Sequence, residues 1–224
     1  ALQYADNVVD LLINRLRKLP LVAADLMKVA SCLGNHGELD TLATVFGHSP
    51  TAMEEALVEV TKAGLLLRQK DSYRFLHDRV QQASYALIDG LQKAVEHLRI
   101  ARLLFSKFSN SELEQSIFEV VNQYNLGASL ITSTEERVRL AQLNLLAGRK
   151  AQKNTAYSSA LQYFAAGLRG LAESDWNDNH LLLFSLRFAH AQCYWLMAEF
   201  AQAEGKFAEL LPFTESAIER ANVY

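Results

Sequence analysis

The sequence predicts an all-α protein with one small β-hairpin. Three observations carry this prediction. The chain holds only 10 Gly and 3 Pro in 224 residues, roughly half of average usage, so turns are few. Apolar residues recur at spacings of three and four along almost the whole chain, which is typical of amphipathic helices. Only one place in the chain shows two short apolar runs around a turn.

Composition excludes several classes of protein. Half of the residues are hydrophobic and 21% are charged, which is ordinary for a soluble globular protein. The net charge of −3 provides no basic field for nucleic acid or for an acidic membrane. The first twenty residues contain Asp6, Asp10 and Arg15, which a secretory signal would not. Cys32 and Cys193 are too far apart in sequence to suggest a disulfide framework. We therefore expect a cytoplasmic protein and, since the chain does not begin with Met, a fragment of a longer one.

Four helices are expected in the first part of the chain. Pro20 separates the first two, because proline cannot continue a helix interior. Gly47 ends the third. Ser49 and Pro50 begin the fourth, since serine caps helix N-termini and proline is tolerated at the first helical position. The expected ranges are 4–18, 21–33, 38–46 and 50–63.

The expected hairpin follows these helices. The runs at 65–68 and 73–76 are apolar, and Lys70, Asp71 and Ser72 form the turn between them. Three helices followed by a hairpin is the element order of a winged helix-turn-helix. The sequence therefore predicts a winged-helix-like module with a preceding helix over residues 1–78.

The rest of the chain, residues 79–224, is expected to be helical. Asp78 is predicted to be an N-cap with Gln81 completing a capping box, and Ser133 with Glu136 predicts a second one. The expected helices are 79–88, 91–107, 111–125, 134–153, 156–172, 180–198, 200–211 and 215–222.

A weak repeat with an offset of 43 residues lies in the last third of the chain. Its small residues and phenylalanine resemble the tetratricopeptide pattern, although that repeat has a period of 34 residues. The repeat predicts tetratricopeptide-like hairpins over 79–224, with an irregular helical bundle as the alternative. We expect Ala160, Phe164, Ala203 and Phe207 to be buried between helices. The repeat positions are Gly148, Ala151, Ala160, Phe164 and Gly167, with counterparts Ala191, Tyr194, Ala203, Phe207 and Leu210.

No catalytic motif is found in the sequence. The six histidines include no pair at helical metal-ligand spacing. A phosphate-binding glycine loop and a nucleophile elbow are both missing. We therefore expect no catalysis, no metal and no cofactor in this chain.

DNA binding through the predicted winged helix is disfavoured by charge. The helix at 50–63 would enter the major groove, yet it carries Glu54, Glu55 and Glu59 against Lys62. Phosphate contacts need lysine or arginine, and base edges are read mainly by donors. The mildly basic hairpin (Arg68, Lys70 and Arg74) is more typical of a solvated turn.

The segment Leu76-His77-Asp78 joins the predicted hairpin to the next helix. It resembles the Met-His-Asp signature that ends the winged-helix domain of STAND signalling ATPases, with leucine in place of methionine. The resemblance implies that His77, with Asp78 beside it, senses the β-phosphate of ADP bound to an adjacent ATPase domain. The alternative is that Asp78 only caps a helix and His77 packs beside it.

A wider resemblance covers nearly the whole chain and is carried by 75–85, 99–104, 118–130 and 143–157. These segments are similar to a region of very large bacterial signalling proteins. Their usual order is a serine/threonine kinase domain, an AAA/STAND ATPase, this helical region, a GAF sensor and a histidine kinase. The resemblance implies a non-catalytic regulatory region that directly follows the ATPase.

The same resemblance implies the cofactors and partners. ATP or ADP with Mg would belong to the ATPase domain of the parent protein. The partners would be the adjacent ATPase and kinase domains, with a protein or small-molecule signal on the helical repeats. Alternative hypotheses are a DNA-binding transcriptional regulator that uses the winged helix, and a structural linker.

Overall fold

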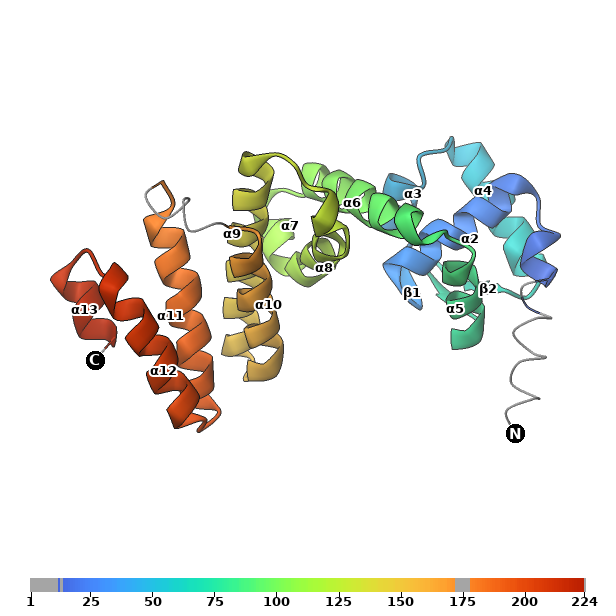
Figure 1. Ribbon diagram of the computed structural model, residues 1–224. Helices are drawn as coiled ribbons and strands as arrows, with labels where there is room; N and C mark the ends of the chain where they lie inside the picture. Colours follow the sequence, from blue (N-terminus) through green and yellow to red (C-terminus); the bar gives the residue numbers. More distant parts are fainter. Residues whose placement is uncertain (1–11, 13, 172–177, 224) are drawn as a thin grey trace. The chain divides into compact units, whose positions relative to one another are not determined.

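The computed structural model describes residues 12, 14–171 and 178–223. Most of the expected helix at 4–18 therefore lies outside the described residues; 14–17 are helical. The described chain is mostly helical with one small antiparallel sheet, which confirms the predicted fold class (Figure 1). It divides into two compact units, the first ending at Phe108 and the second beginning at Ser109.

The first unit alternates helices and short strands. The expected helices at 21–33, 38–46 and 50–63 are all present, and so are both strands of the hairpin. Ser49 caps α4, with its Oγ accepting from the backbone N of Ala52 at 3.2 Å. The elements are α2 (Leu21–Leu33), β1 (His36–Glu38), α3 (Leu39–Phe46), α4 (Pro50–Lys62), β2 (Leu66–Arg68) and β3 (Ser72–Phe75).

The sheet has a third strand that the sequence did not predict. The order is β1-β3-β2, with both pairings antiparallel. Strand β1 places Gly37 opposite Tyr73. A Cβ at Gly37 would lie only 3.1 Å from the Tyr73 ring, so glycine lets the strand approach this buried side chain. The hairpin is thus part of a three-stranded sheet. Residues 36–38 show no strand pattern in the sequence, and they adopt strand conformation because they pair with β3.

Two further helices, α5 (Asp78–Ala86) and α6 (Gly90–Lys107), pack against α2 and α3. Gln81 Nε2 donates to the backbone O of Ser31 at 2.8 Å. A guanidinium N of Arg99 donates to the backbone O of Val45 at 2.7 Å. The compact unit therefore continues past residue 78, the predicted end of the winged-helix module, to Phe108.

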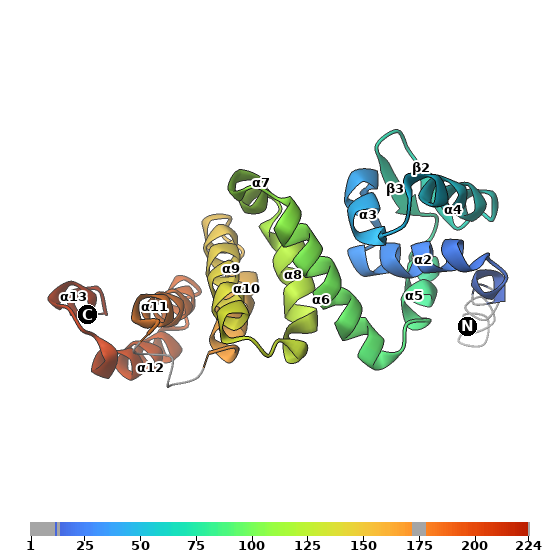
Figure 2. The same ribbon diagram turned by 90° about the horizontal axis from the view of Figure 1, so that it is seen from above.

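The second unit is built from helical hairpins. Helix α9 packs against α10, and α11 packs against α12 (Figures 1 and 2). The single helix expected at 111–125 is two helices, because the backbone breaks at Ser116. The helices are α7 (Asn110–Gln115), α8 (Ile117–Gly127), α9 (Thr134–Lys153), α10 (Tyr157–Arg169), α11 (His180–Leu196), α12 (Phe200–Leu210) and α13 (Ala217–Val223), with short 3₁₀ turns at Ala128–Leu130 and Leu211–Phe213.

The 43-residue offset is repeated in the backbone of the two hairpin turns. Thr155 and Ala198 have φ of 59° and 60°. The backbone N of Ala156 donates to Ala151 O, and that of Glu199 donates to Tyr194 O, both at 2.9 Å. The backbone N of Thr155 donates to Gln152 O, and that of Ala198 donates to Trp195 O, each three residues back. Together these bonds form two Schellman motifs at equivalent positions. The α9–α10 and α11–α12 hairpins therefore turn in the same way.

Candidate functional site

The candidate site of the first unit is the junction between β3 and α5. Leu76, His77 and Asp78 occupy this junction, and all three are exposed. Leu76 is 57% exposed although it is a large apolar residue. Phe75, the last residue of β3, is buried. The strand therefore fixes the backbone from which the exposed side chains at 76–78 project.

His77, rather than Asp78, is the N-cap of α5. Its Nδ1 accepts from the backbone N of Arg79 at 3.3 Å. A neutral imidazole that accepts at one nitrogen carries its proton on the other. Nε2–H is therefore a hydrogen-bond donor on an exposed residue. The prediction of Asp78 as N-cap is wrong because the ring of His77 reaches the first turn of the helix.

Asp78 forms a contact across the unit instead. Its Oδ1 accepts from Asn35 Nδ2 at 2.8 Å, and the backbone O of Asn35 accepts from Phe75 N at 2.8 Å. Asn35 thus links the end of β3 to the start of α5. Gln81 does not complete a capping box with Asp78, since its amide donates to Ser31. Sequence reasoning missed Asn35 because 43 residues separate it from Asp78.

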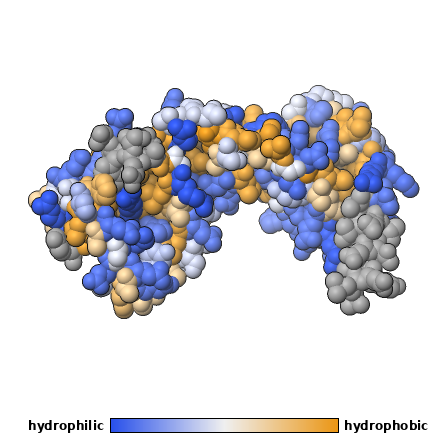
Figure 3. Space-filling view, in the orientation of Figure 1, coloured by the Kyte–Doolittle hydropathy of each residue, from blue (hydrophilic) through white to orange (hydrophobic). Residues whose placement is uncertain are grey.

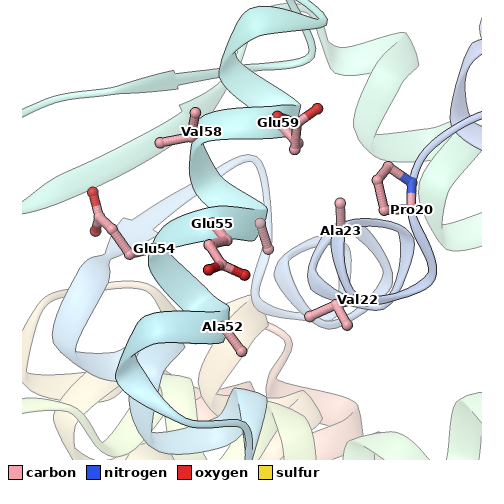
Figure 4. Close-up of a pocket in the computed structure, with 9 residues that line it drawn as sticks. Pro20, Val22, Ala23, Ala52, Glu54, Glu55, Val58 and Glu59 are labelled. Atoms are coloured by element: carbon pink, nitrogen blue, oxygen red, sulfur yellow. The ribbon is translucent and has the colours of Figure 1, made fainter.

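The outer face of α4 is acidic and bounds a groove of about 460 Å³ beside α2 (Figure 4). Glu54, Glu55 and Glu59 lie along this groove and are exposed. Arg68 of the hairpin forms an ion pair with Glu54. The pairing reduces the positive charge that Arg68 could offer to phosphate, and the carboxylates of α4 would repel phosphate.

The repeat positions of the second unit lie mostly at helix contacts. Phe164 is fully buried, and Gly148 lies directly against its ring. Ala151, Ala160, Ala191 and Ala203 are also buried.

Two repeat positions differ from this pattern. Tyr194 is half-buried. Phe207 is also half-buried and lines a groove, so the expectation that it would be buried between helices is wrong. The burial of Phe164 depends on α11, which packs on the same cluster, whereas Phe207 has no equivalent full-length helix over it among the described elements.

Two negative findings apply to the part of the chain that the structure describes. It contains no group of three His, Cys, Asp or Glu side chains that could hold a metal ion. None of its helices is both long and apolar enough to cross a membrane.

Comparison with known proteins finds sequence similarity to a signalling kinase. It is 28% identical to hybrid signal transduction histidine kinase G of Dictyostelium discoideum over 98% of its own length. The chain spans 8% of the length of that relative. No protein-family model and no solved structure matches the chain.

Proposed function

We propose that this chain is a non-catalytic regulatory region of a STAND-type ATPase signalling kinase. Residues 21–76 act as a winged helix that closes on the nucleotide site of an adjacent ATPase domain. The hairpins of the second unit act as a tetratricopeptide-like array that binds a partner or signal. The similarity to a histidine kinase supports the signalling part of this proposal.

The observation that carries the proposal is the hydrogen bonding of the His77 ring. Its Nδ1 is engaged at the start of α5, so Nε2–H is the donor for an external group. A phosphate oxygen is a strong acceptor, and a hydrogen bond to an ionised acceptor is stronger than a neutral one. The bond between Asn35 and Asp78 ties the helix start to the sheet and so positions the ring. ATP, ADP and Mg would be held by the ATPase domain.

The winged-helix assignment is supported by the element order α2-β1-α3-α4-β2-β3 and the sheet order β1-β3-β2. DNA binding, the alternative use of such a module, is disfavoured by the exposed carboxylates of α4 and by the ion pair between Glu54 and Arg68. The experiment on His77 separates a regulatory role from a purely structural linker, because a linker would leave ADP retention unchanged.

The proposal is tested with His77→Ala in the full-length signalling protein. Loss of the donor should weaken ADP binding relative to ATP and shift the switch toward its active state. The measurements are the bound nucleotide after purification and the kinase output. His36→Ala is the matched control, because His36 is also exposed and lies on β1, which pairs with the strand that precedes His77. Unchanged ADP retention and unchanged output would reduce His77 to a helix cap.

A second variant separates capping from nucleotide sensing. In His77→Asn, the short side chain can still cap α5, because asparagine is a favourable N-cap residue. It does not extend as far as the imidazole Nε2. If His77 senses nucleotide, His77→Asn should behave like His77→Ala in ADP retention while keeping the thermal stability of the wild type.

A further inference from the structure

A largely buried histidine joins two helices of the second unit. Hydrophilic residues cover much of the visible face of this unit in Figure 3, with smaller hydrophobic areas between them. His180, the first residue of α11, differs from such surface residues because only 10% of its side chain is exposed. Its ring stacks on Phe184, which packs with Leu210 of α12 and Val223 of α13. His180 therefore lies where α13 meets the α11–α12 hairpin.

Both ring nitrogens of His180 face a carboxylate. Nε2 lies 3.0 Å from Oε1 of Glu219 on α13. Nδ1 lies 3.4 Å from Oε1 of Glu215, which precedes that helix. We call these two pairs the His180 contact. A neutral imidazole has one N–H, whereas the imidazolium ion has two. Only the protonated ring can therefore present a hydrogen to both carboxylates.

Glu219 is held in place by the start of α13. Its backbone N donates to Ser216 Oγ at 3.1 Å, and its Oε2 accepts from the backbone N of Ser216 at 3.2 Å and from that of Glu215 at 2.7 Å. The reciprocal bonds with Ser216 are a capping box. The bond from Glu215 N, followed by the one from His180, holds the pKa of the Glu219 carboxyl below its usual value. This carboxylate is therefore ionised near neutral pH and can only accept.

The other charges around the ring do not favour its protonation as directly. The N-terminus of α11 is the positive end of the helix dipole, and burial disfavours any charged group. The cations on the two helices have contacts of their own: Arg187 lies over the Phe213 ring at 5.2 Å, and Arg220 Nε donates to Thr214 Oγ1 at 3.4 Å. Asp178, which precedes α11, is exposed. The two glutamates in contact with the ring are therefore the groups that favour its positive charge.

We propose that the His180 contact is a pH-sensitive junction that ties α13 to α11 when His180 is protonated. Histidine is the side chain whose charge ordinarily changes between pH 5 and 8. A contact that needs the protonated ring stabilises the fold at the acid end of this range and is lost as the pH rises. One ring nitrogen then presents a lone pair to a carboxylate, and the junction loosens. The inference goes beyond the proposed function, since it involves neither nucleotide nor a partner.

The first measurement follows the protonation of His180 by NMR in the whole chain. The ring Cε1–Hε1 signal is assigned with His180→Gln and titrated with pH. In Glu219→Gln the midpoint should move to lower pH, because the ring loses its ionised acceptor. Glutamine can still complete the capping box, so the start of α13 is kept. Glu204→Gln is the matched control and should leave the midpoint unchanged, since Glu204 is an exposed glutamate of α12 outside the His180 contact.

The second measurement follows α13 itself. Hydrogen exchange of the α13 backbone amides is measured at about pH 5.5 and 7.5 and corrected for the intrinsic pH dependence of exchange. Protection in the wild type should be several-fold higher at the lower pH. His180→Gln should show no such difference, because glutamine does not titrate. His190→Gln is the control on the same helix. Burial lowers the pKa of His190, so its protonation opposes folding, and its replacement should not remove the extra protection at acid pH.

Two results would overturn the inference. The first is a His180 midpoint that Glu219→Gln leaves unchanged or raises. The second is the same pH dependence of α13 protection in the wild type and in His180→Gln. If His180→Gln does not fold, Glu219→Gln replaces it in the exchange experiment, since it also removes the ionised acceptor. The His77 experiment measures nucleotide in another unit of the chain, so failure of either proposal is distinguishable from failure of the other.

Discussion

Gly148 of α9 lies directly against the ring of Phe164 of α10. A Cβ added at Gly148 would lie 2.6 Å from Cδ1 and 2.7 Å from Cζ of the Phe164 ring. Real Cβ atoms do not come so close to a ring, so only glycine fits at this position without a shift of one helix. Phe164 itself is fully buried among Ala141, Ala160 and Leu186. This close contact is part of the interface between α9 and α10.

Phe164→Ala should lower the free energy of unfolding by about 3–5 kcal/mol, as truncation of a buried phenylalanine does. Phe207→Ala is the comparison, because it removes the same atoms from the half-buried repeat equivalent. It should cost clearly less. Urea denaturation of both variants gives the difference, and equal losses would contradict the assigned burial.

Gly148→Ala should destabilise the chain by about 1–3 kcal/mol through overpacking. The double variant Gly148→Ala with Phe164→Leu should recover part of this loss, because the smaller side chain makes room for the new methyl group. A double-mutant cycle measures the coupling between the two positions. Additive effects would show that the two residues do not touch.

Thr155→Gly should stabilise the chain. Thr155 has a φ of 59°, a left-handed conformation that is unfavourable for a β-branched residue. Glycine removes this strain, which is about 1–2 kcal/mol, against a smaller entropic cost in the unfolded chain. Ala198→Gly, at the equivalent turn, should act in the same direction.

The control for the turn is Gln152→Gly. Gln152 lies in the last turn of α9 with ordinary helical geometry, and its Nε2 donates to Gln192 Oε1 at 3.0 Å. Glycine there should destabilise by about 1 kcal/mol through helix propensity, in addition to the loss of this hydrogen bond. Thermal melting of the three variants compares them directly. A loss of stability in Thr155→Gly would contradict the strained turn.

Both cysteines should resist alkylation in the folded protein. Burial raises the pKa of the Cys32 thiol to about 12 and that of Cys193 to about 11. The thiolate is the reactive form, so at pH 8 almost none is present. Iodoacetamide labelling followed by mass spectrometry should find both thiols unmodified under native conditions and modified in urea. Rapid native labelling of Cys193 would mean that α11 opens readily.

The chain should not bind duplex DNA. Glu54, Glu55 and Glu59 are exposed on α4 and repel phosphates, and Arg68 is paired with Glu54. A gel shift with random fragments at moderate salt should show no complex. The triple variant with glutamine at the three positions is the control for charge. A salt-sensitive, sequence-preferring complex of the wild type would favour the transcription-regulator hypothesis.

Local sequence determined most of the helices of this protein. The N-caps Ser49 and Ser133 are found where serine precedes an apolar helical pattern. The 43-residue offset was visible in the sequence and recurs at Thr155 and Ala198. Such features depend on spacing of a few residues along the chain, so the sequence predicts them without knowledge of distant contacts.

Tertiary structure alone decided the strand β1, the cap of α5 and the exposure of Phe207. Residues 36–38 have no strand pattern and become a strand because β3 offers a free edge. His77 caps α5 in place of Asp78. The Asp78 carboxylate instead accepts a hydrogen bond from Asn35, which is 43 residues away in sequence. Phe164 and Phe207 occupy the same repeat position, and α11 covers the first but no equivalent described helix covers the second. Whether a side chain is buried depends on which elements pack against it. The spacing of residues within one hairpin carries no information about those elements.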